Sequence, residues 1–168
     1  MSTSPIQHLV PKLAAVLLVQ LALVGAAVAP QLSARTMGEE YLFTVAPYDP
    51  IDPFRGAYVD LTYPDLALDQ PTGDPAAVDA DDSGRVYVTL REENGLWVAN
   101  GYLTDRPSEG PYLTCDNHGF RFSCGIESYF LPQRDAAAFQ SMINDGTAVA
   151  RVRIDSRGNA SLMAVERR

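Results

Sequence analysis

Lysine is almost missing from this chain, because Lys12 is the single lysine among its 13 basic residues and the others are arginines. The chain beyond residue 12 therefore offers no amine for a Schiff base, a Ser–Lys dyad or a phosphate-binding lysine. Histidine is scarce as well, since His8 lies near the N-terminus and His118 is the only imidazole base after it. These shortages exclude several common catalytic mechanisms.

Positive charge of any kind is also in short supply. The 168 residues include 21 acidic and 13 basic side chains, which gives a net charge of −8. An acidic chain excludes nucleic acid as a partner, because phosphate backbones are bound through Lys and Arg. It also argues against a polybasic attachment to anionic lipid. The length suffices for one domain with a sizeable core.

An uncharged apolar run extends from Leu13 to Ala29 and contains one amide, Gln20. Its 17 residues are at the short end for a transmembrane helix. The alternative is a cleaved signal peptide, because Ala27–Ala29 has the small residues of a cleavage site. Pro30 would then directly follow the cut, where signal peptidases disfavour proline. The sequence therefore favours an uncleaved membrane anchor over residues 1–30, followed by a tether over 31–40 and a domain over 41–168.

The charges that flank the apolar run indicate its orientation. Lys12 and the amino terminus precede the run, whereas Glu39 and Glu40 follow it. The positive-inside rule then places the N-terminus in the cytoplasm. We expect a single-pass protein of the cytoplasmic membrane whose domain faces the periplasm or the cell exterior.

The two cysteines, Cys115 and Cys124, are close in sequence. Two cysteines in an exported domain usually pair, so the sequence predicts a disulfide that stabilises the domain by about 2–3 kcal/mol. Free thiols are one alternative. A metal site that adds His118 and Asp116 is a weaker one, because a single cluster without a second Cys pair is not specific.

Most of the remaining chain shows the alternation of half-buried β-strands. Asn94-Gly95 is a strong signal for a tight hairpin turn. A short helix is predicted over 136–144, with Asp135 as its cap. Residues 65–84 are rich in Pro, Gly and Asp, which indicates a solvated loop. The fold prediction is mainly β (α+β), a short-stranded antiparallel sandwich or partly open barrel with one packed helix. Strands are expected over 41–45, 57–63, 85–90, 96–99, 125–131, 148–154 and 161–166.

The strand at 57–63 carries a family resemblance. Gly56, Tyr58, Leu61 and Tyr63 stand at the motif positions of the GDYXXLXY family of membrane-anchored proteins, and Ala57 replaces the motif aspartate. The prolines and acids at 49–55 and the segment 125–132 also resemble that family. The resemblance implies a single-pass anchor, an extracytoplasmic domain of unassigned activity and an integral membrane protein as partner.

The candidate binding residues lie around this strand. The Arg55 guanidinium could bind a carboxylate or phosphate through two parallel hydrogen bonds. A salt bridge that holds the proline-rich segment in place is favoured instead. Asp49, Asp52 and Glu127 could form a carboxylate set for acid–base work, although Asp before Pro is more typical of turns. The full candidate set is Arg55, Tyr58, Asp49, Asp52, Glu127 and Tyr129. No catalytic residue, metal site or cofactor is predicted.

Three functions remain open at this point. The favoured one is a non-enzymatic subunit or accessory protein of a membrane complex. The second is an envelope module that binds a small ligand or glycan through Tyr58, Tyr87, Tyr102 and Arg55. The third is an envelope hydrolase that uses Asp49, Asp52, Glu127 or His118.

Overall fold

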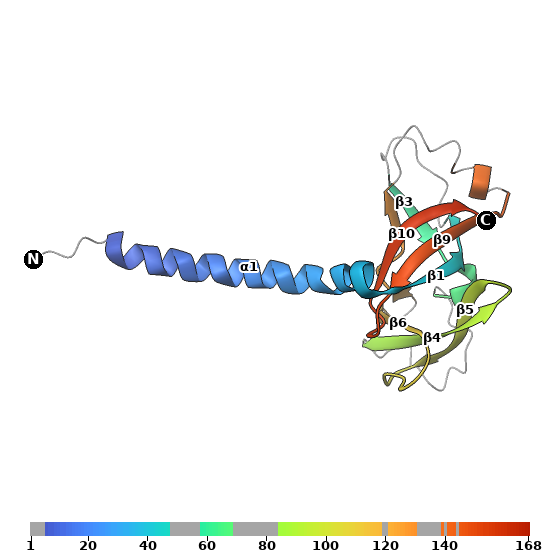
Figure 1. Ribbon diagram of the computed structural model, residues 1–168, viewed down its shortest axis with the longest axis horizontal. Helices are drawn as coiled ribbons and strands as arrows, with labels where there is room; N and C mark the ends of the chain where they lie inside the picture. Colours follow the sequence, from blue (N-terminus) through green and yellow to red (C-terminus); the bar gives the residue numbers. More distant parts are fainter. Residues whose placement is uncertain are drawn as a thin grey trace, which may run out of the picture.

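The protein consists of a long helix that projects from a β domain, as Figure 1 shows. The computed structural model describes residues 6–47, 58–68, 84–118, 121–130, 139, 141–143 and 145–168. The described strands are antiparallel and do not close into a barrel. The prediction of a mainly β fold preceded by an apolar helix is confirmed.

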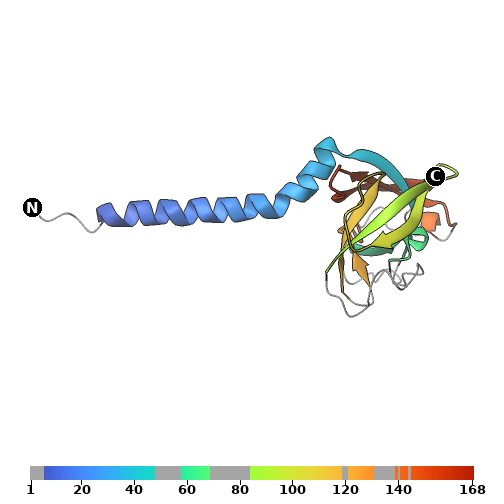
Figure 2. The ribbon, with the colours of Figure 1, turned by 90° about the horizontal axis from the view of Figure 1, so that it is seen from below.

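Helix α1 (Ile6–Met37) is long and apolar enough to cross a membrane. Its side chains from Pro11 to Leu32 are exposed, so the helix does not form part of the domain core. Figure 2 shows that α1 bends shortly before it reaches the domain. Pro30 is the only proline in the second half of α1, and a proline that lacks its amide N–H is the usual cause of such a bend.

The residues predicted as a tether, 31–40, have regular secondary structure. Helix α1 continues to Met37, and strand β1 begins at Glu39. Gly38 alone separates them, and its amide donates to the Ala34 carbonyl at 3.0 Å. The apolar helix is therefore joined to the first strand with no linker between them.

The strands form three small sheets with the orders β1-β9-β10, β2-β3-β8 and β5-β4-β6-β7. A single 3₁₀ turn, η1, follows β3 in the described residues. The bounds are β1 (Glu39–Thr44), β2 (Ala46–Pro47), β3 (Tyr58–Thr62), η1 (Pro64–Leu66), β4 (Arg85–Glu93), β5 (Leu96–Leu103), β6 (Tyr112–Asn117), β7 (Phe122–Ser123), β8 (Ser128–Phe130), β9 (Ala148–Ile154) and β10 (Ala160–Arg167).

Aromatic contacts join the sheets into one core. Tyr41 of β1 meets the half-buried Trp97 of β5 edge-on, with ring centroids 4.8 Å apart. Phe43 of β1 meets Tyr63, which follows β3, at 6.2 Å. Because buried residues alternate with less buried ones along β1, β3 and β4, each of these strands presents one face to this core. In the strand expected over 57–63, the alternate residues Val59, Leu61 and Tyr63 are buried.

The hairpin predicted at Asn94-Gly95 is present, and the strands expected over 148–154 and 161–166 form a second hairpin. Asn94 and Gly95 have φ values of 54° and 80°, as a two-residue turn of the primed type requires. In the second hairpin, β9 and β10 enclose the turn at 155–159. Residues 139 and 141–143 of the predicted helix are helical, and Phe139 is buried.

Three local predictions need correction. Strand β6 was not predicted, because Cys115 and its polar neighbours resemble a loop, yet this strand pairs with β4 in the middle of its sheet. Of the predicted strand 125–131, the structure describes residues 125–130, and these are regular only over Ser128–Phe130. The solvated-loop interpretation of residues 65–84 is wrong at Leu66 and Leu68, which are buried in the core.

Candidate functional site

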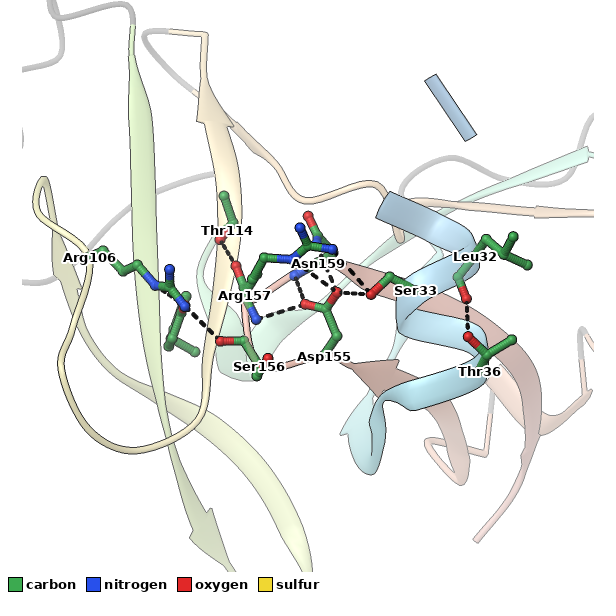
Figure 3. A network of polar contacts seen from close by, with 10 residues as sticks. Leu32, Ser33, Thr36, Arg106, Thr114, Asp155, Ser156, Arg157 and Asn159 are labelled. Carbon is green, nitrogen blue, oxygen red and sulfur yellow. Dashed lines mark hydrogen bonds and ion pairs between the residues drawn. The ribbon is translucent and has the colours of Figure 1, made fainter. Parts of the chain in front are cut away.

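The last turns of α1 dock onto the β domain through polar contacts. Ser33 and Ala34 are buried there, in contrast to the exposed residues before them. The Ser33 hydroxyl donates to the Asp155 carboxylate at 2.5 Å, and Figure 3 shows this contact within a larger network. We call the contact between residues 33–38, at the end of α1, and residues 153–161 of the β9–β10 hairpin the junction.

Asp155 is the centre of the junction. Its side chain is only 3% exposed and accepts four hydrogen bonds: from the Ser33 hydroxyl, the Asn159 amide side chain and the backbone amides of Arg157 and Asn159. Burial alone would raise the pKa of Asp155, but these hydrogen bonds stabilise the charged form more and hold its pKa below the usual range. Asp155 is therefore an ionised structural group rather than a proton donor.

Further contacts fix α1 in one orientation. The Arg35 guanidinium donates to the Ser161 hydroxyl at 2.9 Å, and Arg153 donates to the Arg35 carbonyl. Gly38 has no room for a side chain, since a Cβ there would collide with the Ala34 carbonyl oxygen and the Ile154 backbone. The junction is thus closely packed as well as hydrogen-bonded.

A cavity of about 580 Å³ lies beside the junction, between α1 and the domain. We call it the basic cavity, because three arginines, Arg85, Arg106 and Arg157, face one carboxylate, Asp116. The helix contributes the last residues of its apolar run. The full lining is Ala26, Ala29, Pro30, Arg85, Tyr87, Arg106, Thr114, Asp116, Arg157 and Asn159.

Two of these arginines are held in place by the hairpin turn. Arg106 donates from Nε to the Tyr112 hydroxyl at 2.6 Å and from Nη2 to the Ser156 carbonyl at 2.9 Å. The Arg157 backbone carbonyl accepts a bond from Thr114 at 2.8 Å, and its guanidinium reaches the Ser33 hydroxyl at 3.4 Å. Figure 3 shows Arg106 and Arg157 around the same turn. A second cavity of about 320 Å³ lies nearby and is lined by Glu39, Tyr41 and Asp155 among others.

The residues predicted as a site around β3 are used differently. Glu127 accepts from the backbone amides of Cys124 at 2.5 Å and Gly125 at 3.0 Å. Tyr129 stacks on Phe139 with centroids 5.9 Å apart. The pairing of β3 with β8 places the backbone of Tyr58 opposite that of Phe130. The predicted residues Asp49, Asp52 and Arg55 lie outside the described residues.

The predicted disulfide between Cys115 and Cys124 is present, and no cysteine remains free. It joins β6 to the turn after β7 and points to an oxidising compartment. His118 is exposed, and its backbone amide donates to the Arg121 carbonyl at 3.0 Å. Within the described ranges, no group of three His, Cys, Asp or Glu side chains could hold a metal ion.

Tyr63, the last residue of the sequence motif, has a structural environment. Its ring is buried, and its hydroxyl donates to the Ile126 carbonyl at 2.6 Å. Burial, together with the nearby charge of Glu127, strongly raises the pKa of Tyr63, so the phenol stays protonated. We call β3, Tyr63 and the segment 124–129 the motif region.

The family model described as GDYXXLXY protein matches residues 20–165, which is nearly the whole chain. The chain belongs to the GDYXXLXY family. No curated protein and no solved structure matches it significantly. The match covers both α1, from Gln20 onward, and the β domain, so the helix and domain of this GDYXXLXY protein are part of one family unit.

The junction of this GDYXXLXY protein was missed by sequence reasoning. Asp155 and Ser33 are 122 positions apart, and each has a common type of side chain in an unremarkable context. One weak signal was present: Asp155 begins a five-residue turn with Gly158, whose φ of 77° favours glycine. That signal identifies the turn, but not the helix that packs against it.

Proposed function

We propose that this GDYXXLXY protein is a membrane-anchored, extracytoplasmic accessory subunit of a membrane complex and has no catalytic activity of its own. The observation that carries the proposal is the hydrogen-bonded, closely packed junction between α1 and the β domain. A flexible linker would suffice to keep a domain near a membrane. A hydrogen-bonded and closely packed junction also fixes the orientation of the domain relative to the helix, and so relative to anything that the helix binds.

Helix α1 has features of a helix that contacts another helix in the bilayer. Gln20 is exposed within the apolar run, and an amide in hydrocarbon gains from a hydrogen-bonding partner. Ala15 and Ala22 share another face of α1, because they are seven residues, or about two helical turns, apart. Small residues allow a second helix to approach closely. These two faces support an integral membrane protein as the partner.

The extracytoplasmic side is supported by two independent observations. The Cys115–Cys124 disulfide is stable in an oxidising compartment and rare in the cytosol. Lys12 precedes the apolar run and Glu39 and Glu40 follow it, which suits a cytoplasmic N-terminus. A C-terminal alkaline phosphatase fusion, active only after export, tests this orientation. An inactive fusion would contradict it.

The carboxylates of the described residues also suit a structural protein. Asp155 and Glu127 are the two with the most hydrogen bonds, and backbone amides are among the donors to both. Glu127, His118 and Tyr129 do not line either of the two cavities beside the junction. Tyr87 does line the basic cavity, which keeps ligand binding as a second candidate function.

Purification from the native membrane in a mild detergent tests the proposal. We expect an integral membrane protein to remain bound to the tagged chain in a fixed ratio. Gln20→Leu removes the amide within the apolar run, and Ala22→Leu adds bulk to the small-residue face. Loss of the partner in either variant would identify the helix face that it contacts. Leu23→Ile is the control, because it changes neither polarity nor volume.

The outcomes separate the candidate interfaces. Loss of the partner in Arg55→Ala, with no loss in the helix variants, would move the contact to the segment before β3. A wild-type chain that purifies alone, with the disulfide intact and α1 embedded in detergent, would contradict the subunit role.

A further inference from the structure

The basic cavity lies where α1 changes from apolar to polar surroundings. Its helical wall is formed by Ala26, Ala29 and Pro30, and the apolar run ends at Ala29. In a membrane-anchored chain, residues at the end of an apolar run lie near the level of the lipid headgroups. The opening of the basic cavity is therefore at the depth of the phosphate groups of the adjoining leaflet.

The cavity concentrates positive charge on an acidic protein. Three of its ten lining residues are arginines and one is an acid, whereas the whole chain carries −8. Asp116 lies opposite Arg85 in the pairing of β6 with β4, and Arg157 Nε lies 3.9 Å from the Asp155 carboxylate, so two acids offset part of this charge. Three guanidinium groups around one cavity repel one another unless an anion lies between them.

The arginines keep donors free for such an anion. The Arg85 side chain is exposed and makes no hydrogen bond or ion pair with any other side chain in the described part of the chain. Arg106 uses its Nε and one terminal nitrogen for Tyr112 and Ser156, and a guanidinium has five N–H donors in total. Arg157 is 61% exposed at its side chain. Guanidinium groups suit phosphate oxygens because two parallel N–H bonds match their geometry.

We propose that the basic cavity binds the phosphate of an anionic phospholipid headgroup from the leaflet in which α1 ends. Arg106 and Arg157 are held in position by the β9–β10 turn, and Arg85 supplies the group that is free to move onto the phosphate. The sequence-level expectation that an acidic chain lacks an electrostatic grip on lipid concerns the net charge. The fold gathers arginines from β4, the 104–111 loop and the β9–β10 turn, which the net charge does not show.

Native mass spectrometry of the full chain released from nanodiscs tests this site. The nanodiscs contain phosphatidylglycerol and phosphatidylcholine in equal amounts, and the measurement is the ratio of the two lipids retained. We expect the wild type to enrich phosphatidylglycerol. Arg85→Gln should lower this enrichment about fivefold, the effect of one Arg beside an anionic surface, and Arg85→Lys should restore most of it.

Arg91→Gln is the matched control. Arg91 lies on the same strand, β4, six residues from Arg85, and forms a surface ion pair with Glu93 at 2.7 Å. The Arg91→Gln variant should leave the enrichment of phosphatidylglycerol unchanged. Equal retention of both lipids by the wild type would overturn the proposal, and so would an equal loss in Arg91→Gln and Arg85→Gln, which would indicate attraction without a site.

Titration with inorganic phosphate separates a lipid from a soluble ligand. If the wild type binds inorganic phosphate as tightly as phosphatidylglycerol, and Arg85→Gln weakens both, the lipid assignment is overturned in favour of a soluble phosphate. Because these measurements use the isolated protein, their result is independent of whether a partner subunit exists.

Discussion

The junction and the motif region each hold a carboxylate in a shell of hydrogen bonds, but they differ in what surrounds it. In the motif region, Glu127 binds the backbone of its own loop, three residues away or fewer. In the junction, Asp155 binds its own turn and also Ser33, which belongs to a distant helix. The first carboxylate closes a loop, whereas the second connects two parts of the molecule.

The two regions also differ in what remains available. Around β3, three aromatic or acidic side chains are engaged: Tyr63 with Ile126, Tyr129 with Phe139 and Glu127 with the 124–125 backbone. Beside the junction, guanidinium donors line an open cavity. The comparison teaches that Leu61 and Tyr63, which match the family motif, serve the architecture here, while side chains available for interaction lie next to the membrane helix.

The largest expected effect comes from the turn that supports the junction. Gly158 has a φ of 77°, and a Cβ there would lie 2.6 Å from both the Thr114 hydroxyl and the Tyr112 ring. Gly158→Ala should lower the free energy of unfolding by about 3–5 kcal/mol, from left-handed strain plus overpacking. Chemical unfolding of the full chain in detergent, followed by Trp97 fluorescence, measures this change.

Gly95→Ala is the control for Gly158→Ala. Gly95 has a φ of 80°, but nothing lies within 4 Å of an added Cβ. Gly95→Ala should therefore lower the free energy of unfolding by about 1–2 kcal/mol, from left-handed backbone strain alone. Equal losses in the two variants would show that the β9–β10 turn is not closely packed against β6, and the distinction between the two regions would weaken.

A smaller effect is expected from the carboxylate of the junction. Asp155→Asn replaces an oxygen acceptor with an amide nitrogen in a nearly fully buried site. It should lower the free energy of unfolding by about 2–3 kcal/mol at pH 7, because buried donors lose a charged acceptor. Glu127→Gln, in the half-exposed loop of the motif region, should cost about 1 kcal/mol.

The pH dependence of this pair sharpens the comparison. The pKa of Asp155 is lowered in the folded state, so its stabilisation is present above the ordinary carboxyl pKa of about 3.9 and is lost as the pH falls through the folded value. The difference between wild type and Asp155→Asn should therefore narrow below about pH 4. If the difference in unfolding free energy between wild type and Asp155→Asn stays constant as the pH falls from 7 to well below about 4, the ionised role of Asp155 is contradicted.

The parts of the fold that follow from local sequence were predictable. The Asn94-Gly95 turn and the alternation over 148–154 identify both hairpins, because each signal lies within a few neighbouring residues. The cysteine pair was predictable for the same reason. Strand β6 was not, since Asp116 and Asn117 have low strand propensity, and only the pairing with β4 and β7 and the burial of Asn117 place them in a sheet.

The junction and the basic cavity could not be predicted, because they depend on which distant residues meet. Arg85, Arg106 and Arg157 come from three separate segments. Each one, taken alone, is an ordinary surface arginine, and the net charge argues against a cationic site. Sequence reasoning instead favoured the residues of the family motif. A family motif can reflect structure as well as function. In this chain, Leu61 is buried in the core, and Tyr63 is buried and hydrogen-bonded to the Ile126 carbonyl.

The smallest expected effect concerns Tyr63 in the motif region. Tyr63→Phe removes the bond to the Ile126 carbonyl and should cost about 1 kcal/mol at pH 7. The pKa of Tyr63 is raised in the folded state, mainly by burial, so its stabilisation is complete below the unfolded pKa of about 10 and is lost as the pH rises above it.

Wild type should therefore lose stability above about pH 10 faster than Tyr63→Phe does, so that the variant's deficit shrinks and reverses. The stability of the variant will still fall with rising pH in this range, because burial raises the pKa of Tyr41 and Tyr102 as well. Tyr87→Phe, at the half-buried tyrosine beside the basic cavity, is the control. If Tyr63→Phe and wild type fall in parallel from pH 7 to 11, the phenol of Tyr63 is open to solvent, and the motif region is not the closed structural unit that distinguishes it from the junction.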